Sequence, residues 1–504
     1  MQDSVKNEFN LQKNTRIMKK YILLAITIAV GASLASCMKD GFYYETAAGL
    51  SESRQEGAES GDVFNKIQEN DFVKVSEQPV STFSVDADGA AYSYMRRCIN
   101  SGFLPDANSV RIEEFLNYFT FDYNDPAGEE SLGINAELGD CPWAEGHKLL
   151  RLGLKGKSMK DSEIPDANYI LLIDTSGSMQ GSDRIELLKT GLCNMIDYMR
   201  PDDRIAIITY SGSVKKLLES TLVKDASAIK KAIRGLKASG STAGGEAMKM
   251  AYEEAVEHYA EGGNNRIIMC TDGDFNVGVS NTSALVEMVE SYLEKGIYLS
   301  IMGFGTGNFQ DARMEDLSNH GNGTYTYIDS EEEMMKVFVN ERSRFYAVAN
   351  DTKCQVRFDT ASVDSYRLIG YENRMMANED FEDDKKDAGE IGAGQTITAL
   401  YEIIPAEGFA AGTPVADFNV RYKKALGEDS RELSLNVDSA IAEPSDNFNF
   451  AAGIAAYGLW LRDSKYKGAA NASLALELVE SSLEFDPYDL RAQLVQLMRK
   501  AANM

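Results

Sequence analysis

Three loops of this chain carry oxygen-bearing side chains that could bind a metal ion or attack a substrate. The segment LLIDTSGSMQGSD places Asp174, Ser176 and Ser178 at alternate positions directly after an apolar run. Thr242 lies in the glycine-rich segment GSTAGG, and Asp272 follows the apolar run RIIMCT. Three hydroxyls and two carboxylates make an all-oxygen set, which suits a small hard cation such as Mg²⁺.

The charge of this set favours binding over catalysis. Two carboxylates supply only two negative charges, so a divalent cation would stay attractive to an outside carboxylate. We expect the three hydroxyls to be direct ligands and the carboxylates to act directly or through waters that they orient. An acidic side chain of a protein or peptide partner would then replace a water. Mg²⁺ is the expected ion, with Mn²⁺ or Ca²⁺ as alternatives.

The elements that must position these loops alternate along the middle of the chain. Apolar runs predict strands at 169–174, 204–210, 266–271, 297–304 and 324–328, and helical spacing predicts helices at 184–199, 226–236, 245–259, 283–295 and 331–340. Near-continuous apolar strands with intervening amphipathic helices indicate a mainly parallel sheet covered on both faces. Ligands of such sheets bind beyond the carboxyl ends of the strands, so the three loops are expected to converge.

A chain of 504 residues is long enough for several domains. The expected segments are a signal peptide (1–37), a flexible acidic tether (38–80), an α+β segment (81–165), the α/β domain (166–345), a β-rich sandwich-like domain (346–440) and a helical segment (441–504). The strands after residue 351 could share a sheet with those before residue 160. In that case the α/β unit would be an insertion within a β domain.

The five candidate ligands match a known pattern position by position. They resemble the metal-ion-dependent adhesion site of von Willebrand factor type A (VWA) domains. Beyond them, STFSVDADGAAYSYMRR, VRIEEFLNYF, CPWAEGHKLLRLGLKGK and RLIGYENRMMANEDFEDDKKDAGEIGAG resemble the bacterial YfbK-type VWA lipoprotein family. The resemblance covers nearly the whole chain after the tether and implies a doubly wound, Rossmann-like α/β fold. Ser239 and Gln310 replace a common glycine and asparagine, and neither is a ligand position.

Three neighbouring residues are candidates for contact with a partner. Phe275 and Phe309 could form an apolar rim on the same face, and packing inside their loops is the alternative. Asp274 could orient a ligand, although a solvated turn aspartate is the favoured interpretation. The acidic run NEDFEDDKKDAGE lacks the spacing of an EF-hand loop and is expected to be a solvated loop.

The first residues resemble a bacterial lipoprotein signal. A short basic region and an apolar stretch precede LASC, in which Cys37 would carry the lipid. This predicts a protein of the cell envelope, at the outer membrane, the periplasmic face or the cell surface, with Met1 or Met18 as the start. Of the remaining cysteines, Cys98 and Cys141 are the one pair considered as a candidate disulfide.

The sequence gives less support to two other classes of function, which are binding to polyanions and hydrolysis. A formal charge of -27 disfavours nucleic acids and anionic lipid surfaces. An aspartic-type hydrolase would need a repeated D-T-G motif, and Ser176 interrupts the single approximate copy. A serine hydrolase would need a base, yet His258 lies in a predicted helix and His320 in a glycine-bounded turn. We therefore expect no catalysis.

A VWA unit could instead serve an ATPase-driven assembly or metal-insertion system. That alternative requires access to ATP in the cytosol. The export signal argues against it, because a lipid-anchored domain outside the inner membrane would not meet cytosolic ATPases.

Overall fold

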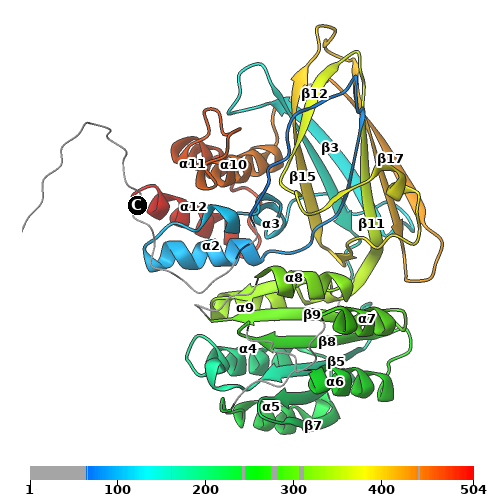
Figure 1. Cartoon of the computed structure of the whole chain (residues 1–504), viewed down its shortest axis with the longest axis vertical. Coiled ribbons are helices and arrows are strands. Elements are labelled where there is room, and N and C mark those ends of the chain that lie inside the picture. Colours follow the sequence, from blue (N-terminus) through cyan, green and yellow to red (C-terminus); the bar gives the residue numbers. More distant parts are fainter. Residues whose placement is uncertain are drawn as a thin grey trace, which may run out of the picture. The chain divides into compact units, whose positions relative to one another are not determined.

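The strands form three sheets in the described part of the chain (Figure 1). The structure is a computed structural model that describes residues 64, 66–160, 162–240, 245–273, 282–305, 311–440 and 443–504. One sheet belongs to an α/β unit in the middle of the chain. The other two are antiparallel and face each other across a common core.

The sheet of the α/β unit has six strands in the order β10-β9-β8-β5-β6-β7. Their bounds are β5 (Ala167–Asp174), β6 (Arg204–Tyr210), β7 (Val214–Leu222), β8 (Asn264–Thr271), β9 (Ile297–Phe304) and β10 (Tyr325–Ile328). All neighbours are parallel except β6 and β7. The predicted mainly parallel sheet is therefore confirmed, and β7 adds an antiparallel edge that the sequence did not predict.

Helices cover both faces of this sheet. They are α4 (Ile185–Tyr198), α5 (Ala226–Arg234), α6 (Gly245–Glu257), α7 (Thr282–Leu293), α8 (Asp311–His320) and α9 (Glu331–Met335), the last followed by a π-helical turn at Lys336–Asn340. Side chains alternate between the faces of a strand. Ile170 and Leu172 of β5 accordingly join the core under α6, while Leu171 and Ile173 join the core under α4 and α5.

The other two sheets combine strands from both ends of the chain. One has the order β1-β12-β15-β4-β3 and the other β13-β2-β11-β16-β17, with β14 paired to β11. The bounds are β1 (Val73–Lys74), β2 (Val80–Ser84), β3 (Leu132–Asp140), β4 (Lys148–Gly156), β11 (Ala347–Phe358), β12 (Val363–Ile369), β13 (Met375–Met376), β14 (Ile391–Gly392), β15 (Thr396–Pro405), β16 (Pro414–Lys423) and β17 (Arg431–Asp438).

Pairing across the α/β unit makes these sheets one sandwich. β4 pairs with β15, and β2 pairs with β11. Figure 1 shows the blue and cyan strands beside the yellow and orange ones. The α/β unit thus lies between strands that share sheets, as one of the two alternatives above required.

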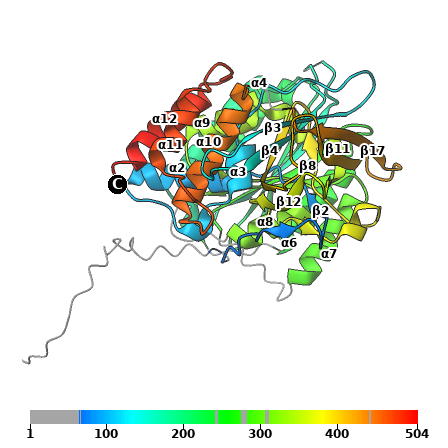
Figure 2. The same ribbon diagram turned by 90° about the horizontal axis from the view of Figure 1, so that it is seen from above.

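Early and late helices pack together in the same way. α2 (Ala90–Ser101) and α3 (Ile112–Asn117) share a hydrophobic core with α10 (Asp446–Leu461), α11 (Ala472–Glu480) and α12 (Leu490–Ala501). Figure 2 shows α2 beside α10, α11 and α12. Ser445 caps α10 by accepting a hydrogen bond from the Phe448 N–H. In the described ranges, no helix has the length and apolar character needed to cross a membrane.

The disulfide considered for Cys98 and Cys141 is not formed. Cys98 packs in the core of the α/β unit, whereas Cys141 packs in the core shared by the early and late helices. Each behaves as a small buried hydrophobic residue.

Candidate metal centre at the carboxyl edge of the sheet

Asp174 and Asp272 lie next to each other because their strands are neighbours. β5 and β8 run parallel with Ile173 opposite Cys270, so Asp174 ends one strand beside the residue that ends the other. Asp272 follows directly. Asp174 is 0% exposed and Asp272 is 6% exposed, so the two carboxylates are buried side by side at the carboxyl edge.

The loop after β5 turns both serine hydroxyls toward each other. The Ser176 N–H donates to Asp174 Oδ1 at 2.7 Å, which fixes the start of the loop. A short 3-10 turn at Gly177–Met179 follows, and Met179 is buried beneath it. The Ser176 and Ser178 hydroxyl oxygens are 2.8 Å apart. The turn therefore gathers three oxygen-bearing side chains within a few residues.

Backbone hydrogen bonds bring the second loop to the first. The Gly177 N–H donates to the Gly240 carbonyl at 3.0 Å, and the Ser239 N–H donates to the Thr175 carbonyl at 2.7 Å. Thr242 itself lies outside the described residues, in the segment between Gly240 and the start of α6. Ser239 and Gly240, which precede that segment, are therefore in direct contact with the loop that carries Ser176 and Ser178, here called the serine loop.

Burial makes Asp174 a costly anion in this position. Burial, together with the neighbouring Asp272 carboxylate, raises the pKa of Asp174 to about 6, although the hydrogen bond from the Ser176 N–H opposes this shift. A buried carboxylate needs compensation by a positive charge or by hydrogen bonds. An all-oxygen set with a buried, under-compensated carboxylate fits a divalent cation.

Two side chains beside Asp174 were not identified from the sequence. Thr271 donates from its hydroxyl to Asp174 Oδ2 at 3.4 Å, and Tyr210 is buried opposite Asp174 at the end of β6. Both residues end strands adjacent to β5, and that position in the predicted sheet was the available signal. Arg184 also contributes, because its Nη1 donates to the Ser178 carbonyl at 3.1 Å.

Several predicted residues lie outside the described residues. They are the partner-contact candidates Asp274, Phe275 and Phe309, the ligand candidate Thr242 and the lipidation candidate Cys37.

The described residues also contain two other groups with metal-ligand types. One is Asp86, Asp88 and Glu315, and the other is Glu254, Glu257 and His258. Arg374 forms ion pairs with all three carboxylates of the first group. Lys216 pairs with Glu254 in the second at 2.6 Å. Each group therefore already has a protein cation in contact with its carboxylates.

His258 and His320 each lie beside a carboxylate. His320 ends α8, which corrects the glycine-bounded turn expected for it, and its Nδ1 lies 2.9 Å from Glu290 Oε1. His258 follows α6, and its Nε2 lies 3.6 Å from Glu254 Oε1. Both imidazoles thus have carboxylate neighbours on helices rather than at the serine loop.

Comparison with family models covers almost all of the described chain. Residues 168–341 match the von Willebrand factor type A domain, and residues 58–151 match a model described as von Willebrand factor. Residues 343–418 and 410–504 match the C-terminal region of the uncharacterized protein YfbK. Domains of the VWA type often bind a divalent metal and are typically interaction modules without catalytic activity.

Solved structures with similarity include a von Willebrand factor type A protein from Catenulispora acidiphila, at 13% identity and a TM-score of 0.42, over 76% of this chain and 91% of that chain. BatB from Bacteroides thetaiotaomicron is 22% identical with a TM-score of 0.31, over 36% of this chain and 98% of that chain.

Sequence relatives extend this result. The uncharacterized protein sll0103 of Synechocystis is 30% identical over 44% of this chain and 50% of its own length. The uncharacterized protein YfbK of Escherichia coli is 35% identical over 464 residues, which are 87% of this chain and 80% of that protein. The chain belongs to the YfbK family of proteins with a von Willebrand factor type A domain.

Proposed function

We propose that this protein binds an acidic group of a protein partner through a Mg²⁺ ion at the carboxyl edge of the α/β sheet. The ligands are Asp174, Ser176, Ser178, Thr242 and Asp272. The single observation that carries the proposal is the buried Asp174 carboxylate beside the paired Ser176 and Ser178 hydroxyls. Bound Mg²⁺ would supply a positive charge and one position open to an outside carboxylate.

The protein side chains have distinct roles in this proposal. Ser176, Ser178 and Thr242 supply neutral oxygens, which leave the ion's charge only partly compensated. Asp174 and Asp272 supply the negative charge, directly or through waters. The Ser176 N–H holds Asp174 Oδ1 in place, so this carboxylate does not have to reorganise when the ion arrives.

The metal part of the proposal is tested by calorimetry on the full-length protein. Wild type should bind Mg²⁺ saturably, and Asp174→Ala and Thr242→Ala should each abolish or strongly weaken binding. Asp183→Ala is the matched control, because Asp183 is exposed on the same loop as Asp174. Normal binding by Thr242→Ala would refute the ligand set. Titrations with Mn²⁺ and Ca²⁺ would rank the ions.

The partner part needs a separate measurement. Immobilised protein would be incubated with a peptide library that contains aspartate and glutamate, in Mg²⁺ and in EDTA. A library with asparagine and glutamine at the same positions is the control. Retention should require both Mg²⁺ and the carboxylates. Equal retention of the two libraries would remove the acidic group from the proposal.

We place the protein in the cell envelope, anchored by lipid at Cys37, at the outer membrane, the periplasmic face or the cell surface. The support is the LASC segment after a basic and apolar stretch. Mass spectrometry of the protein from membranes should find a lipidated residue at Cys37, and Cys37→Ser should release the protein into the soluble fraction. A Cys37→Ser protein that stays in the membrane fraction would contradict the anchor.

A further inference from the structure

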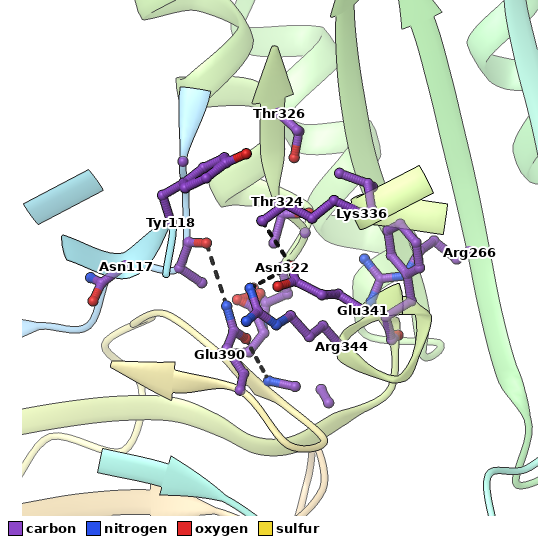
Figure 3. A pocket seen from close by; sticks show the side chains of 18 of the residues that line it. Asn117, Tyr118, Arg266, Asn322, Thr324, Thr326, Lys336, Glu341, Arg344 and Glu390 are labelled. Atoms are coloured by element: carbon purple, nitrogen blue, oxygen red, sulfur yellow. Dashed lines mark hydrogen bonds and ion pairs between the residues drawn. The ribbon is translucent and has the colours of Figure 1, made fainter. Parts of the chain in front are cut away.

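A cavity of about 60 Å³ lies between the α/β unit and the sandwich. Arg266 near the start of β8 and Thr324 just before β10 line it from the α/β unit, and Glu390 and Gln395 line it from the sandwich. Figure 3 shows the labelled side chains around it. The starts of parallel strands lie at the opposite edge from Asp174, so the cavity is separate from the candidate metal centre.

The lining has buried polar atoms that the described residues leave without a hydrogen-bond partner. They are Arg266 Nε, Asn322 Nδ2, Asn322 Oδ1, Glu333 Oε1, Glu341 Oε1 and Glu390 Oε1. Burying such atoms without partners is costly, and native proteins rarely retain them. The cavity therefore requires a polar occupant, which is either water or a small polar molecule. Four of these atoms are acceptors and two are donors, as the residue types require.

Asn322 is the most constrained of these residues. Its side chain is 1% exposed and its backbone has a left-handed φ of 42°. On the next residue, a Cβ at Gly323 would lie 1.7 Å from the Leu299 carbonyl oxygen, so the loop is pressed against β9. The amide is held in the cavity wall and cannot turn out to solvent.

Arg266 presents a buried positive charge to the cavity. Its Nη1 donates to the Ser300 hydroxyl at 2.7 Å and its Nη2 to the Phe345 carbonyl at 2.9 Å, so both of these partners are neutral. Burial lowers the pKa of Arg266, and the Glu390 carboxyl group opposes this shift. No direct hydrogen bond between Arg266 and Glu390 is found in the described ranges. Burial raises the pKa of Glu390 well above its usual range, and Arg266 opposes this shift.

The other cations of the lining are already engaged. Lys336 Nζ and Arg344 Nη1 both bind Glu341 Oε2, at 2.8 and 2.7 Å. Three basic and three acidic side chains line the cavity in all, namely Arg266, Lys336, Arg344, Glu333, Glu341 and Glu390. A ligand with an ammonium group and a carboxylate offers donors to the unpartnered carboxyl oxygens and acceptors to Arg266 Nε, and its ammonium group would favour the ionised form of Glu390.

We propose that the cavity binds a small zwitterion, a free α-amino acid of the size of glycine or alanine. Its ammonium group donates hydrogen bonds toward Glu390 Oε1, Glu341 Oε1 and Asn322 Oδ1. Its carboxylate accepts from Arg266 Nε and Asn322 Nδ2. One water molecule needs about 10–15 Å³ of cavity volume. A cavity of about 60 Å³ therefore holds roughly four to six non-hydrogen atoms.

The test is calorimetry of the full-length protein with glycine and with alanine. We expect saturable binding of both. Acetate and methylammonium carry one charged group each and should bind far more weakly, and leucine should be excluded by size. Asn322→Gly removes the amide and keeps a residue that favours the left-handed backbone. It should weaken glycine binding by roughly tenfold to a hundredfold, and Glu390→Gln should do the same.

Asp489→Gly is the matched control, because Asp489 is an exposed residue with a similar left-handed φ of 57°. It should bind glycine like wild type. Absence of saturable glycine and alanine binding in a cooperatively folded protein would overturn the proposal and leave a hydrated cavity. Equal binding of acetate or methylammonium would also overturn it, as would unchanged affinity in both cavity variants. None of these results depends on Mg²⁺, so they leave the metal proposal untouched.

Discussion

The Gly177 N–H lies 3.0 Å from the Gly240 carbonyl oxygen and donates a hydrogen bond to it. These residues are far apart in the chain, and their contact joins the serine loop to the segment that leads into α6. Gly240 has a φ of 91°, a conformation that glycine adopts readily and other residues avoid. The contact between Gly177 and Gly240 therefore depends on a backbone geometry that a side chain would strain.

We expect Gly240→Ala to weaken Mg²⁺ binding about tenfold. A left-handed alanine costs about 1–2 kcal/mol, and the backbone would relax by moving away from Gly177. Calorimetry with Mg²⁺ measures the effect. Gly128→Ala is the control, because Gly128 has a φ of 64° and open space around its Cβ position. Equal affinities for both variants would mean that the second loop does not set metal affinity.

Local sequence patterns were sufficient to predict the α/β unit. The strands at Arg204–Tyr210 and Ile297–Phe304 have the predicted bounds, because each is an apolar run that ends at polar residues. The position of Asp174 and Asp272 at one edge followed from the same pattern, since parallel neighbours end together. Spacing alone could thus predict which loops meet.

Other features depend on contacts between distant parts of the chain. β7 is an edge strand with many exposed polar residues, and α8 is a short polar helix, so neither has a strong periodic pattern. The pairing of β4 with β15 joins residues more than two hundred positions apart. The cavity around Asn322 is formed by residues from widely separated parts of the chain, from Ala87 to Gln395, so no local motif could have revealed it.

Cys98 and Cys141 should both react with iodoacetamide in denaturant without any reductant, because each is a thiol. In the native protein, burial raises the pKa of Cys141 to about 12, so little thiolate is present and alkylation should be slow. Peptide mass spectrometry distinguishes the two conditions. A peptide pair that needs reduction before alkylation would instead show that Cys98 and Cys141 form a disulfide.

Arg96→Met should strongly destabilise the protein. The Arg96 guanidinium pairs with Asp329 and Glu333, and its side chain is 9% exposed, so the variant would leave buried carboxylates without their cation. Loss of one partner from such a pair costs about 3–5 kcal/mol. Arg499→Met is the control. Arg499 pairs with Glu480 at the surface, where the loss is about 1 kcal/mol or less. Urea unfolding followed by circular dichroism would separate these outcomes, and similar shifts would contradict the role of burial.

Because of Glu113, the free energy of unfolding should fall as the pH rises above 4.5, the ordinary pKa of a glutamate. Burial, together with the nearby acidic groups Glu372, Asp86 and Glu114, raises the pKa of Glu113 from 4.5 to about 8, although Arg462 opposes this shift. The folded state therefore holds a proton that the unfolded state has already released. This contribution is fully present below pH 4.5 and is lost as the pH rises to about 8.

Glu113→Gln should flatten the pH dependence of unfolding, because the amide stays neutral at every pH. Between about pH 5 and about pH 8, we expect the free energy of unfolding of the variant to increase by roughly 2–4 kcal/mol relative to that of the wild type. Urea unfolding at both pH values measures this difference. Glu407→Gln, at an exposed position, is the control and should follow the wild-type profile. Parallel profiles for wild type and Glu113→Gln would show that Glu113 is ionised in the folded protein at neutral pH.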